Sequence, residues 1–310
     1  MKRVFIDGSA GTTGLRLQQR LKNHQQIELI SLLEQDRKNP KARQKAAQQA
    51  DAVVLCLPDE AAKEAVQLYE GYQGVLLDTS TAHRTNKDWA YGLPQLGQKQ
   101  KQQIQSAKKI AVPGCHACGV IALLYPLIQH GFLDNSQPIH CFSITGYSGG
   151  GKAMIEEYQN PQRNDLLNAP RMYGLTQQHK HLKEIKGITG LQEFPIFSPI
   201  VADFYNGMQV VIPLHISQIK KGSIEQIKQL YQQQYTDEII QYQEVDSQEP
   251  FLPAMAFADK DCMKIGVYGN EQRMTLVARY DNLGKGASGA AVECLNLSLG
   301  LPHTEGLHIT

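Results

Sequence analysis

Four short, almost wholly apolar runs lie within the first 80 residues, and they constrain the fold more than any other feature of the chain. The runs are Arg3–Asp7, Ile27–Leu33, Ala52–Leu57 and Gly74–Asp78. Stretches with apolar residues at helical spacing separate them, and residues 59–68 are the clearest of these. Apolar strands that alternate with helices are typical of a parallel sheet covered on both faces. We therefore predict an α/β, doubly wound first domain.

A region of different character follows Pro113-Gly114. We predict helices at Cys115–Gln129 and Ser223–Tyr235, strands at His140–Tyr147, Met208–Ile216 and Met274–Asp281, and a loop at Gly149–Gly151. Antiparallel strands with helices on one face would make this an α+β domain. A last helix is predicted at Lys285–Leu299, because Gly300 and Pro302 follow it. The Gln- and Lys-rich stretch Gln98–Gln105 is interpreted as a solvated connector.

Composition excludes several classes of protein. The 310 residues include 31 Lys and Arg against 30 Asp and Glu, a balance that argues against a nucleic-acid partner. The longest apolar run, residues 119–128, is far shorter than the roughly 20 residues that span a bilayer. We expect no secretory leader, because Met1-Lys2-Arg3 leads straight into the first apolar run without an apolar segment of adequate length, and the 6 cysteines are scattered rather than paired in a disulfide framework. We expect a cytoplasmic protein with reduced thiols and no membrane contact.

A glycine-rich loop directly follows the first predicted strand and opens a helix. Its residues are Gly8, Ser9, Ala10, Gly11, Thr12, Thr13 and Gly14. Small residues let the backbone approach a pyrophosphate, which free N–H groups and the helix dipole would then hold. The spacing G-x-x-G-x-x-G departs from the G-x-G-x-x-G dinucleotide fingerprint, so a plain tight turn is the competing interpretation.

The end of the second apolar run bears on which dinucleotide would bind. Glu34 could accept a hydrogen bond from a ribose 2′-hydroxyl, as in NAD sites. Arg37 and Lys38 could instead hold the 2′-phosphate of NADP. A solvated charged loop is a third interpretation, and the residues alone leave all three open.

Cys115 is the clearest candidate for chemistry. It follows Pro113-Gly114 at the start of a predicted helix, where the helix N-terminus should stabilise a thiolate. Such a thiolate is a candidate nucleophile for acyl transfer. A buried structural thiol and a redox pair with Cys118 are the alternatives, whereas a zinc site would need two more ligands that the spacing does not supply.

An ordered set of motifs resembles the N-acetyl-γ-glutamyl-phosphate reductase family. The set comprises Tyr91-Gly92-Leu93-Pro94, Pro113-Gly114-Cys115 with Gly119, His179-Lys180-His181-Leu182-Lys183-Glu184-Ile185 and Asp281-Asn282-Leu283-Gly284-Lys285-Gly286-Ala287. The segments Asp78-Thr79-Ser80-Thr81-Ala82-His83-Arg84-Thr85 and Gly146-Tyr147-Ser148-Gly149-Gly150-Gly151-Lys152 resemble its shorter, type 2 branch. The chain departs from the family pattern at Gln95, Cys118 and Lys183, where the family usually has Glu, Thr and Pro.

The resemblance implies an aspartate-semialdehyde-dehydrogenase-like fold. It predicts a Rossmann-type NADP-binding domain over residues 1–114 and an α+β catalytic and dimerisation domain over residues 115–284. It also predicts that residues 285–310 return to the first domain as a C-terminal helix. Members use NADPH and are homo-oligomers, dimers or tetramers, which favours Arg37 and Lys38 as ligands of a 2′-phosphate. Ser80 and Asn282 are further cofactor-binding residues that the resemblance implies.

The resemblance also implies a reaction, the NADPH-dependent reduction of N-acetyl-L-glutamyl 5-phosphate in arginine biosynthesis. Cys115 would form a thioester and His181 would move protons, because a histidine titrates near neutrality. His179, Arg84 and Lys152 are candidate substrate-binding residues, and Lys285-Gly286 is a further anion-binding candidate. No metal ligand is expected. The alternatives are aspartate-semialdehyde dehydrogenase, a carrier-linked lysine-pathway reductase, and a non-catalytic NADPH-binding regulator.

Overall fold

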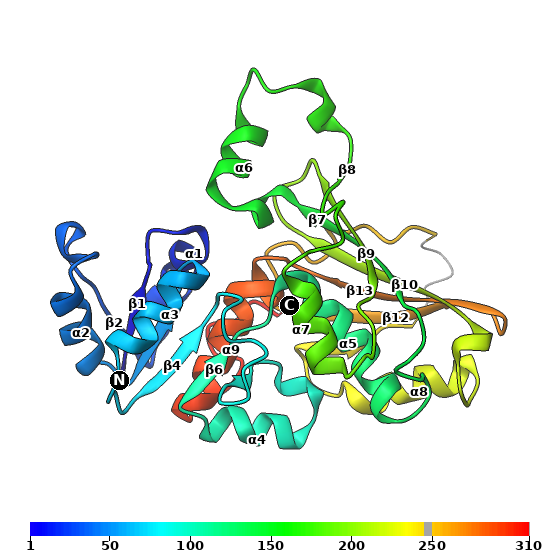
Figure 1. Ribbon diagram of the computed structural model, residues 1–310, viewed down its shortest axis with the longest axis horizontal. Helices are drawn as coiled ribbons and strands as arrows, with labels where there is room; N and C mark the ends of the chain where they lie inside the picture. Colours follow the sequence, from blue (N-terminus) through cyan, green and yellow to red (C-terminus); the bar gives the residue numbers. More distant parts are fainter. Residues whose placement is uncertain (245–249, 310) are drawn as a thin grey trace. The chain divides into compact units, whose positions relative to one another are not determined.

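The computed structural model describes residues 1–244 and 250–309 and divides the chain into two compact units (Figure 1). Unit 1 consists of Met1–Gly114 and Ala287–Leu307. Unit 2 consists of Cys115–Gly286, with the last residues from His308. The return of the chain to unit 1 therefore begins at Ala287, close to where the C-terminal helix was expected.

Unit 1 is built on a six-stranded parallel sheet. Its strands, in spatial order, are β2 (Ile27–Ile30), β1 (Lys2–Asp7), β3 (Ala52–Leu55), β4 (Val75–Asp78), β6 (Lys109–Ala111) and β5 (Ala90–Tyr91). The chain runs from β1 outward to β2 and then returns past β1 to β3. In doubly wound sheets, ligands bind outside the carboxyl ends of the strands at such a switch point. The β1 exit thus sits where a cofactor loop belongs.

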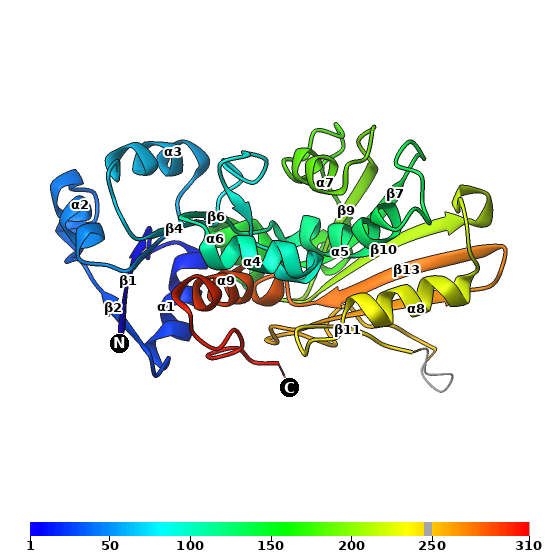
Figure 2. The ribbon, with the colours of Figure 1, turned by 90° about the horizontal axis from the view of Figure 1, so that it is seen from below.

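Helices cover both faces of this sheet. One face packs on α1 (Thr12–Lys22), α4 (Gln98–Ser106) and α9 (Gly289–Leu299), and the other on α2 (Pro40–Gln48) and α3 (Asp59–Leu68). Figure 2 shows α1 and α9 on the side of β1 opposite α2 and α3. Successive residues of β1 alternate between the two cores, so Val4 and Ile6 join one and Phe5 the other. This confirms the doubly wound α/β prediction.

Two predictions for unit 1 were wrong in detail. Gln98–Gln105 is not a connector but part of α4, because Ile104 is buried in the core and Gln and Lys are good helix formers. The predicted last helix is not α-helical from Lys285, since Gly284–Ser288 form a π-helix that leads directly into α9 at Gly289. Gly300 ends α9 in the left-handed conformation, as a glycine C-cap should.

Unit 2 contains a seven-stranded mixed sheet. Its strands, in spatial order, are β11 (Ile240–Tyr242), β12 (Met263–Gly269), β13 (Arg273–Tyr280), β10 (Met208–His215), β7 (His140–Gly146), β9 (Ile196–Ala202) and β8 (Arg171–Met172). The pairs β12–β13, β13–β10, β10–β7 and β9–β8 are antiparallel, whereas β7–β9 and β11–β12 are parallel. This sheet confirms the α+β character of the second region, although β8, β9, β11 and β12 were not predicted.

One face of the unit 2 sheet carries the exposed side chains of Phe142, Ile196 and Met172 and is called the open face below. α5 (Cys115–Gln129) packs on β10 and β13, α7 (His181–Thr189) on α5, and α8 (Ile224–Gln234) on β11 and β12. α6 (Gly151–Gln159) and η4 (Asp165–Asn168) belong to an excursion between β7 and β8 (Figure 1). The glycine run was predicted to be a loop, but Gly151 is the first residue of α6. The remaining 3₁₀ turns are η1 (Glu34–Asp36), η2 (Pro94–Leu96), η3 (Tyr147–Gly150) and η5 (Ile216–Gln218).

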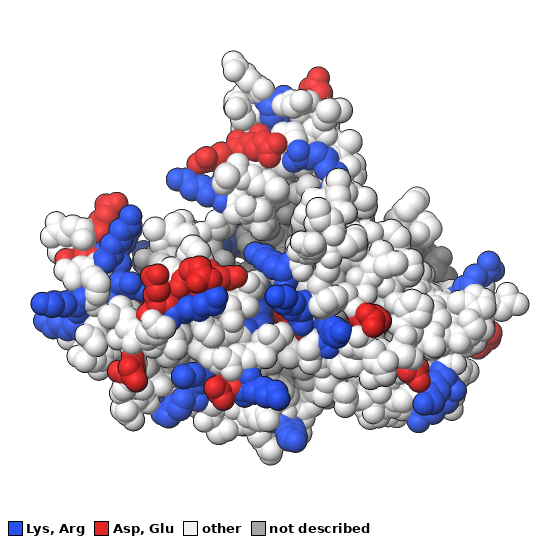
Figure 3. Space-filling model, in the orientation of Figure 1, with Lys and Arg blue, Asp and Glu red and all other residues white. Residues whose placement is uncertain are grey.

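Charges of both signs are interspersed over the described part of the face in Figure 3. Opposite charges that lie close together cancel much of each other's field at a distance. Among the residues that the structure describes, no helix is long and apolar enough to cross a membrane.

Candidate active site

The candidate nucleophile, Cys115, is the first residue of α5 and is partly exposed. Tyr280, at the end of β13, donates its hydroxyl hydrogen to the Cys115 carbonyl at 2.6 Å. The same hydroxyl accepts from the Gly119 N–H at 3.1 Å. It thus bridges the two backbone groups that pair with each other in a regular first turn. A Cβ at Gly119 would lie 2.5 Å from this hydroxyl, which explains the glycine four residues after the cysteine.

The segment around Gly286 packs against the other side of Cys115. A Cβ at Gly286 would lie 3.0 Å from the Cys115 Cβ, so only a glycine fits there without displacement. Asp281 shapes the approach to this point by accepting from the N–H groups of Leu283 at 2.6 Å and Gly284 at 2.9 Å. The Asp281–Ala287 motif therefore begins with a carboxylate-bound turn that brings backbone close to the thiol.

Three histidines cluster beside Cys115. The ring of His116 lies 5.6 Å from those of His179 and His181, which are 4.8 Å apart. Burial lowers the pKa of His116 to about 3, and the charge of Lys180 and the neighbouring His179 act in the same direction. Burial and Lys180 also lower the pKa of His179 to about 4. His116 and His179 are thus neutral near pH 7, and His181 stays the predicted proton carrier.

The predicted substrate-binding lysine lies in a different setting. The Lys152 side chain is 86% exposed, and its Nζ is 3.8 Å from the Glu156 carboxylate one turn along α6. Asn282 is buried and accepts from the Gly207 N–H at 2.9 Å while donating to the Ser148 hydroxyl at 3.0 Å. The amide of Asn282 therefore holds two loops of unit 2 together. Cofactor contact by Asn282 and substrate contact by Lys152 stay predictions.

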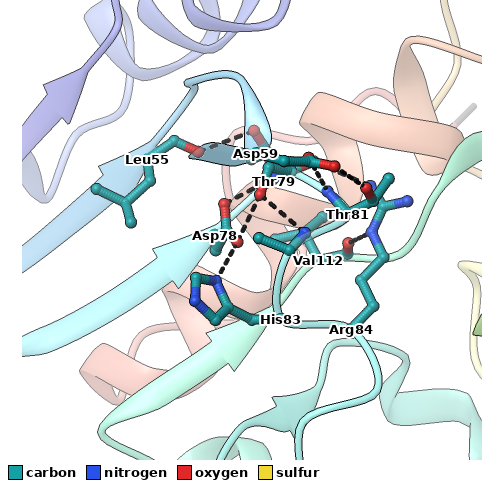
Figure 4. A network of polar contacts seen from close by, with 10 residues as sticks. Leu55, Asp59, Asp78, Thr79, Thr81, His83, Arg84 and Val112 are labelled. Carbon is teal, nitrogen blue, oxygen red and sulfur yellow. Dashed lines mark hydrogen bonds and ion pairs between the residues drawn. The ribbon is translucent and has the colours of Figure 1, made fainter. Parts of the chain in front are cut away.

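Ser80 and Arg84 lie in unit 1, in the turn that leaves β4. Figure 4 shows Arg84 there, beside Val112. Asp78 accepts from the Ser80 hydroxyl at 2.7 Å and from the His83 ring at 2.6 Å, and His83 stacks on Trp89. Arg84 donates to the carbonyls of Val112 and Thr79, both at 2.9 Å. These bonds fix the Arg84 guanidinium against the strand that leads, three residues later, to the candidate nucleophile.

The glycine loop lines a cavity of about 620 Å³ within unit 1. Gly8, Ser9 and Ala10 line the cavity, and so do Arg37 and Lys38. Gly8 has a φ of +90°, and a Cβ there would lie 2.3 Å from the Cys56 carbonyl oxygen. A Cβ at Gly14 would lie 2.5 Å from the Gly8 carbonyl oxygen. The loop is a tight turn that places backbone at the mouth of a cavity, as a dinucleotide site requires.

A buried charge network borders the same cavity and was not predicted from the sequence. Asp7, directly before Gly8, receives the Arg43 guanidinium at 2.7 Å and the Tyr69 hydroxyl at 2.5 Å. Asp7 and Arg43 both line the cavity. The cavity therefore has three cationic side chains beside it, and one of them is fixed by a carboxylate. Among the described residues, no cluster of His, Cys, Asp and Glu could hold a metal ion.

Comparisons with known proteins match nearly the whole chain. Residues 3–104 match the family model "Semialdehyde dehydrogenase, NAD binding domain", and residues 115–282 match "Semialdehyde dehydrogenase, dimerisation domain". The chain is 42% identical over 319 positions to N-acetyl-gamma-glutamyl-phosphate reductase 2 of Nostoc sp., covering 98% of this chain and 99% of that protein. It is 41% identical to N-acetyl-gamma-glutamyl-phosphate reductase of Brucella ovis, covering 96% and 99%.

Solved structures match the fold. Aspartate semialdehyde dehydrogenase II from Vibrio cholerae has a TM-score of 0.72 at 15% identity, covering 97% of this chain and 99% of that one. Aspartate semialdehyde dehydrogenase with NADP from Candida albicans has a TM-score of 0.68 at 16% identity, covering 96% and 98%. This chain therefore has the aspartate-semialdehyde-dehydrogenase-like fold, with a nicotinamide-dinucleotide-binding domain.

Proposed function

The chain belongs to the N-acetyl-γ-glutamyl-phosphate reductase family, and we propose from this premise that it reduces an acyl phosphate to an aldehyde. The substrate would be N-acetyl-L-glutamyl 5-phosphate and the products N-acetyl-L-glutamate 5-semialdehyde and phosphate, a step of arginine biosynthesis. The observation that carries the proposal is the family match over nearly the whole chain, joined to a partly exposed cysteine at the start of α5 beside three histidines. Its thiol chemistry suits a reducing compartment, and we propose the cytoplasm.

The chemistry begins at Cys115. Its thiolate attacks the acyl carbon, the bond from carbon to the phosphate oxygen breaks, and phosphate leaves as a thioester forms. When bound, the nicotinamide supplies the hydride that reduces the carbonyl carbon. The thiohemiacetal that results on Cys115 collapses by cleavage of the carbon–sulfur bond, which releases the aldehyde and the thiolate. His181 moves the protons at the oxygen and the sulfur, while His179 stays neutral beside it.

The first prediction concerns the reaction, run in the direction of oxidation. Purified protein should reduce NADP when given N-acetylglutamate 5-semialdehyde and phosphate. Cys115→Ser should abolish turnover, because a serine hydroxyl is a weak nucleophile without an activating base. His181→Asn should lose about 10²–10⁴-fold in kcat, and His179→Asn less.

Three outcomes would contradict this assignment. Turnover of aspartate semialdehyde but not of the acetylated substrate would favour the fold relative over the proposed reaction. A larger loss for His179→Asn than for His181→Asn would exchange their roles. A Cys115 thiol that no alkylating agent modifies near neutral pH would favour a non-catalytic regulator.

We propose NADPH as the cofactor, because the cavity behind the glycine loop has cations where a 2′-phosphate would lie. Arg37 and Lys38 line it, and Asp7 and Tyr69 hold Arg43 at its edge. Gly8, Ser9, Ala10, Gly11, Thr12, Thr13 and Gly14 would hold the pyrophosphate. Glycines are required at both positions 8 and 14, because a Cβ at either one would meet backbone atoms of the turn. A tight turn of this kind is what a dinucleotide site uses. Glu34 also borders the cavity and is the residue that an NAD site would use.

The cofactor prediction tests whether Arg37 and Lys38 recognise the 2′-phosphate of NADPH. Arg37→Gln and Lys38→Gln should each raise KM for NADPH by about 10- to 100-fold, since each removes a hydrogen bond to a charged group. KM for NADH, which lacks the 2′-phosphate, should change little. Lys41→Gln, an exposed lysine on α2 outside the cavity lining, is the matched control and should resemble wild type. Equal rises in KM for both dinucleotides would mean that Arg37 and Lys38 do not select NADP.

We propose that the chain forms a homo-oligomer through the open face of the unit 2 sheet. Phe142, Ile196 and Met172 are 44%, 48% and 56% exposed on neighbouring strands. Phe142 lies opposite Val211 and Ser198 in the register, so its surroundings on this face are only weakly polar. Contiguous exposed apolar area of this kind marks an interaction site. The match of residues 115–282 to a dimerisation-domain model supports an interface within unit 2.

A single charge placed on this face tests the oligomer. Phe142→Asp should shift the particle mass measured by light scattering towards that of one chain, 34.5 kDa. Leu15→Asp, which places the same charge at an exposed apolar site in unit 1, should leave the mass unchanged. A Phe142→Asp protein with the mass of wild type would place the interface elsewhere.

A further inference from the structure

A buried carboxylate fixes one of the cations that line the unit 1 cavity. Asp7 is the last residue of β1 and is 3% exposed, whereas Arg43 lies in α2 with 17% of its side chain exposed. Arg43 donates to Asp7 Oδ1 through Nε at 3.1 Å and to Oδ2 through Nη2 at 2.7 Å. Tyr69, which directly follows α3, donates its hydroxyl hydrogen to Oδ2 at 2.5 Å. Three elements of unit 1 therefore determine where the guanidinium lies.

The contact with Asp7 leaves one edge of the Arg43 guanidinium unused. A guanidinium carries five N–H groups, and this side-on contact uses one on Nε and one on Nη2. Among the residues that the structure describes, no hydrogen bond engages Nη1. Nη1 and the outer hydrogen of Nη2 therefore form a second pair of parallel donors. Because Arg43 lines the cavity, this pair is available to a ligand bound there.

The position of Arg43 in the fold indicates which ligand group it fits. Parallel guanidinium donors bind a phosphate through two hydrogen bonds. In doubly wound folds, the 2′-phosphate of NADP lies beyond the end of the second strand, where an arginine accommodates it. Arg43 is in α2, the helix that follows β2, and it lines the same cavity as Arg37 and Lys38.

Arg43 differs from the other two cations in being held in place. Arg37 and Lys38 are exposed, and neither side chain has a hydrogen bond or ion pair among the described residues. A flexible cation loses rotamer freedom when it binds an anion, and this loss weakens binding. Arg43 is already ordered by its bonds to Asp7, so it binds without that cost.

We propose that Arg43 binds the 2′-phosphate of the dinucleotide, and that Asp7 and Tyr69 are positioning residues that hold its second donor pair at the cavity. The inference rests on the proposed use of NADPH and adds a residue to that site. It also explains why a carboxylate lies there. A negative charge beside an anion site opposes binding, unless the carboxylate orders a cation that the ligand needs.

The test is equilibrium binding of two isomeric fragments to the full chain, measured by calorimetry. Adenosine 2′,5′-bisphosphate carries a 2′-phosphate, whereas ADP carries both phosphates on its 5′ oxygen. Arg43→Lys keeps a positive charge beside Asp7 but lacks the planar donor pair. It should weaken binding of the bisphosphate by about 10-fold, the effect of losing one hydrogen bond between charged groups, and leave the affinity for ADP nearly unchanged.

Asp7→Asn separates positioning from charge, because the two predict changes of opposite sign. The substitution removes a negative charge beside the cavity, so attraction between charges alone would tighten binding of the bisphosphate. An asparagine has a single acceptor oxygen and cannot accept both side-on bonds, so Arg43 is no longer fixed. We therefore expect the bisphosphate to bind about 10-fold more weakly, with little change for ADP.

A pair of tyrosine variants tests the positioning role without changing any charge. Tyr69→Phe removes the hydroxyl that holds Asp7 Oδ2 and should weaken binding of the bisphosphate by about 3-fold. Tyr72→Phe is the matched control, since Tyr72 packs on the same core but donates to the Ala50 carbonyl at 2.9 Å. It should bind both fragments as wild type does. This comparison holds even where Asp7→Asn yields little folded protein by circular dichroism.

Each outcome decides one point. Equal losses for ADP and the bisphosphate in Arg43→Lys overturn the assignment to the 2′-phosphate. Tighter binding of the bisphosphate by Asp7→Asn, or equal affinities in the two tyrosine variants, overturns the positioning role. Neither fragment is a substrate, so a selective loss in a protein without reductase turnover would refute the proposed reaction alone. Turnover with NADPH in a protein whose Arg43→Lys variant keeps both affinities would refute this inference alone.

Discussion

A single tyrosine hydroxyl organises the start of α5, and the arrangement of the candidate active site depends on it. Tyr280 bridges the Cys115 carbonyl and the Gly119 N–H, which anchors the first turn of the helix to the end of β13. Two glycines follow from this constraint. Gly119 leaves room for the hydroxyl, and Gly286 lets the segment that follows β13 lie against Cys115. The thiol is thus held by backbone contacts on two sides before any side chain acts on it.

Close backbone contacts also explain the glycines in the loop of unit 1. Gly8 and Gly14 are required because a Cβ would meet backbone at 2.3 and 2.5 Å, whereas a Cβ at Gly11 would meet nothing closer than 3.7 Å. The first and last glycines therefore build the turn, and the middle position is small for another reason, such as approach of a pyrophosphate. Asp7 adds a buried negative charge at this point, and Arg43 and Tyr69 compensate it. Because Arg43 offsets the charge of Asp7, the cavity stays suited to an anionic ligand.

The strands and helices whose formation depends on neighbouring residues were predicted from the sequence. The four apolar runs became β1–β4, and Cys115–Gln129 and Asp59–Leu68 became helices with the predicted bounds. The predictions that were wrong involve contacts between residues far apart in the sequence. Ile104 is an example, because its burial makes the polar stretch around it the helix α4. The contacts of His116 with the hydroxyls of Ser143 and Tyr173 join three elements, and no spacing rule connects residues 27 and 57 positions apart. Arg43 was missed for the same reason, since its partner Asp7 is 36 residues away.

The central claim is that Cys115 becomes acylated during turnover, and the acyl-enzyme can be observed directly. With N-acetylglutamate 5-semialdehyde and NADP but no phosphate, the thioester has no acceptor and should accumulate. The account predicts about one equivalent of NADPH per active site, with the acyl group located on Cys115 itself by fragmentation of the peptide that carries it. Formation of NADPH without acylation of that peptide, or acylation of Cys118 in its place, would contradict it.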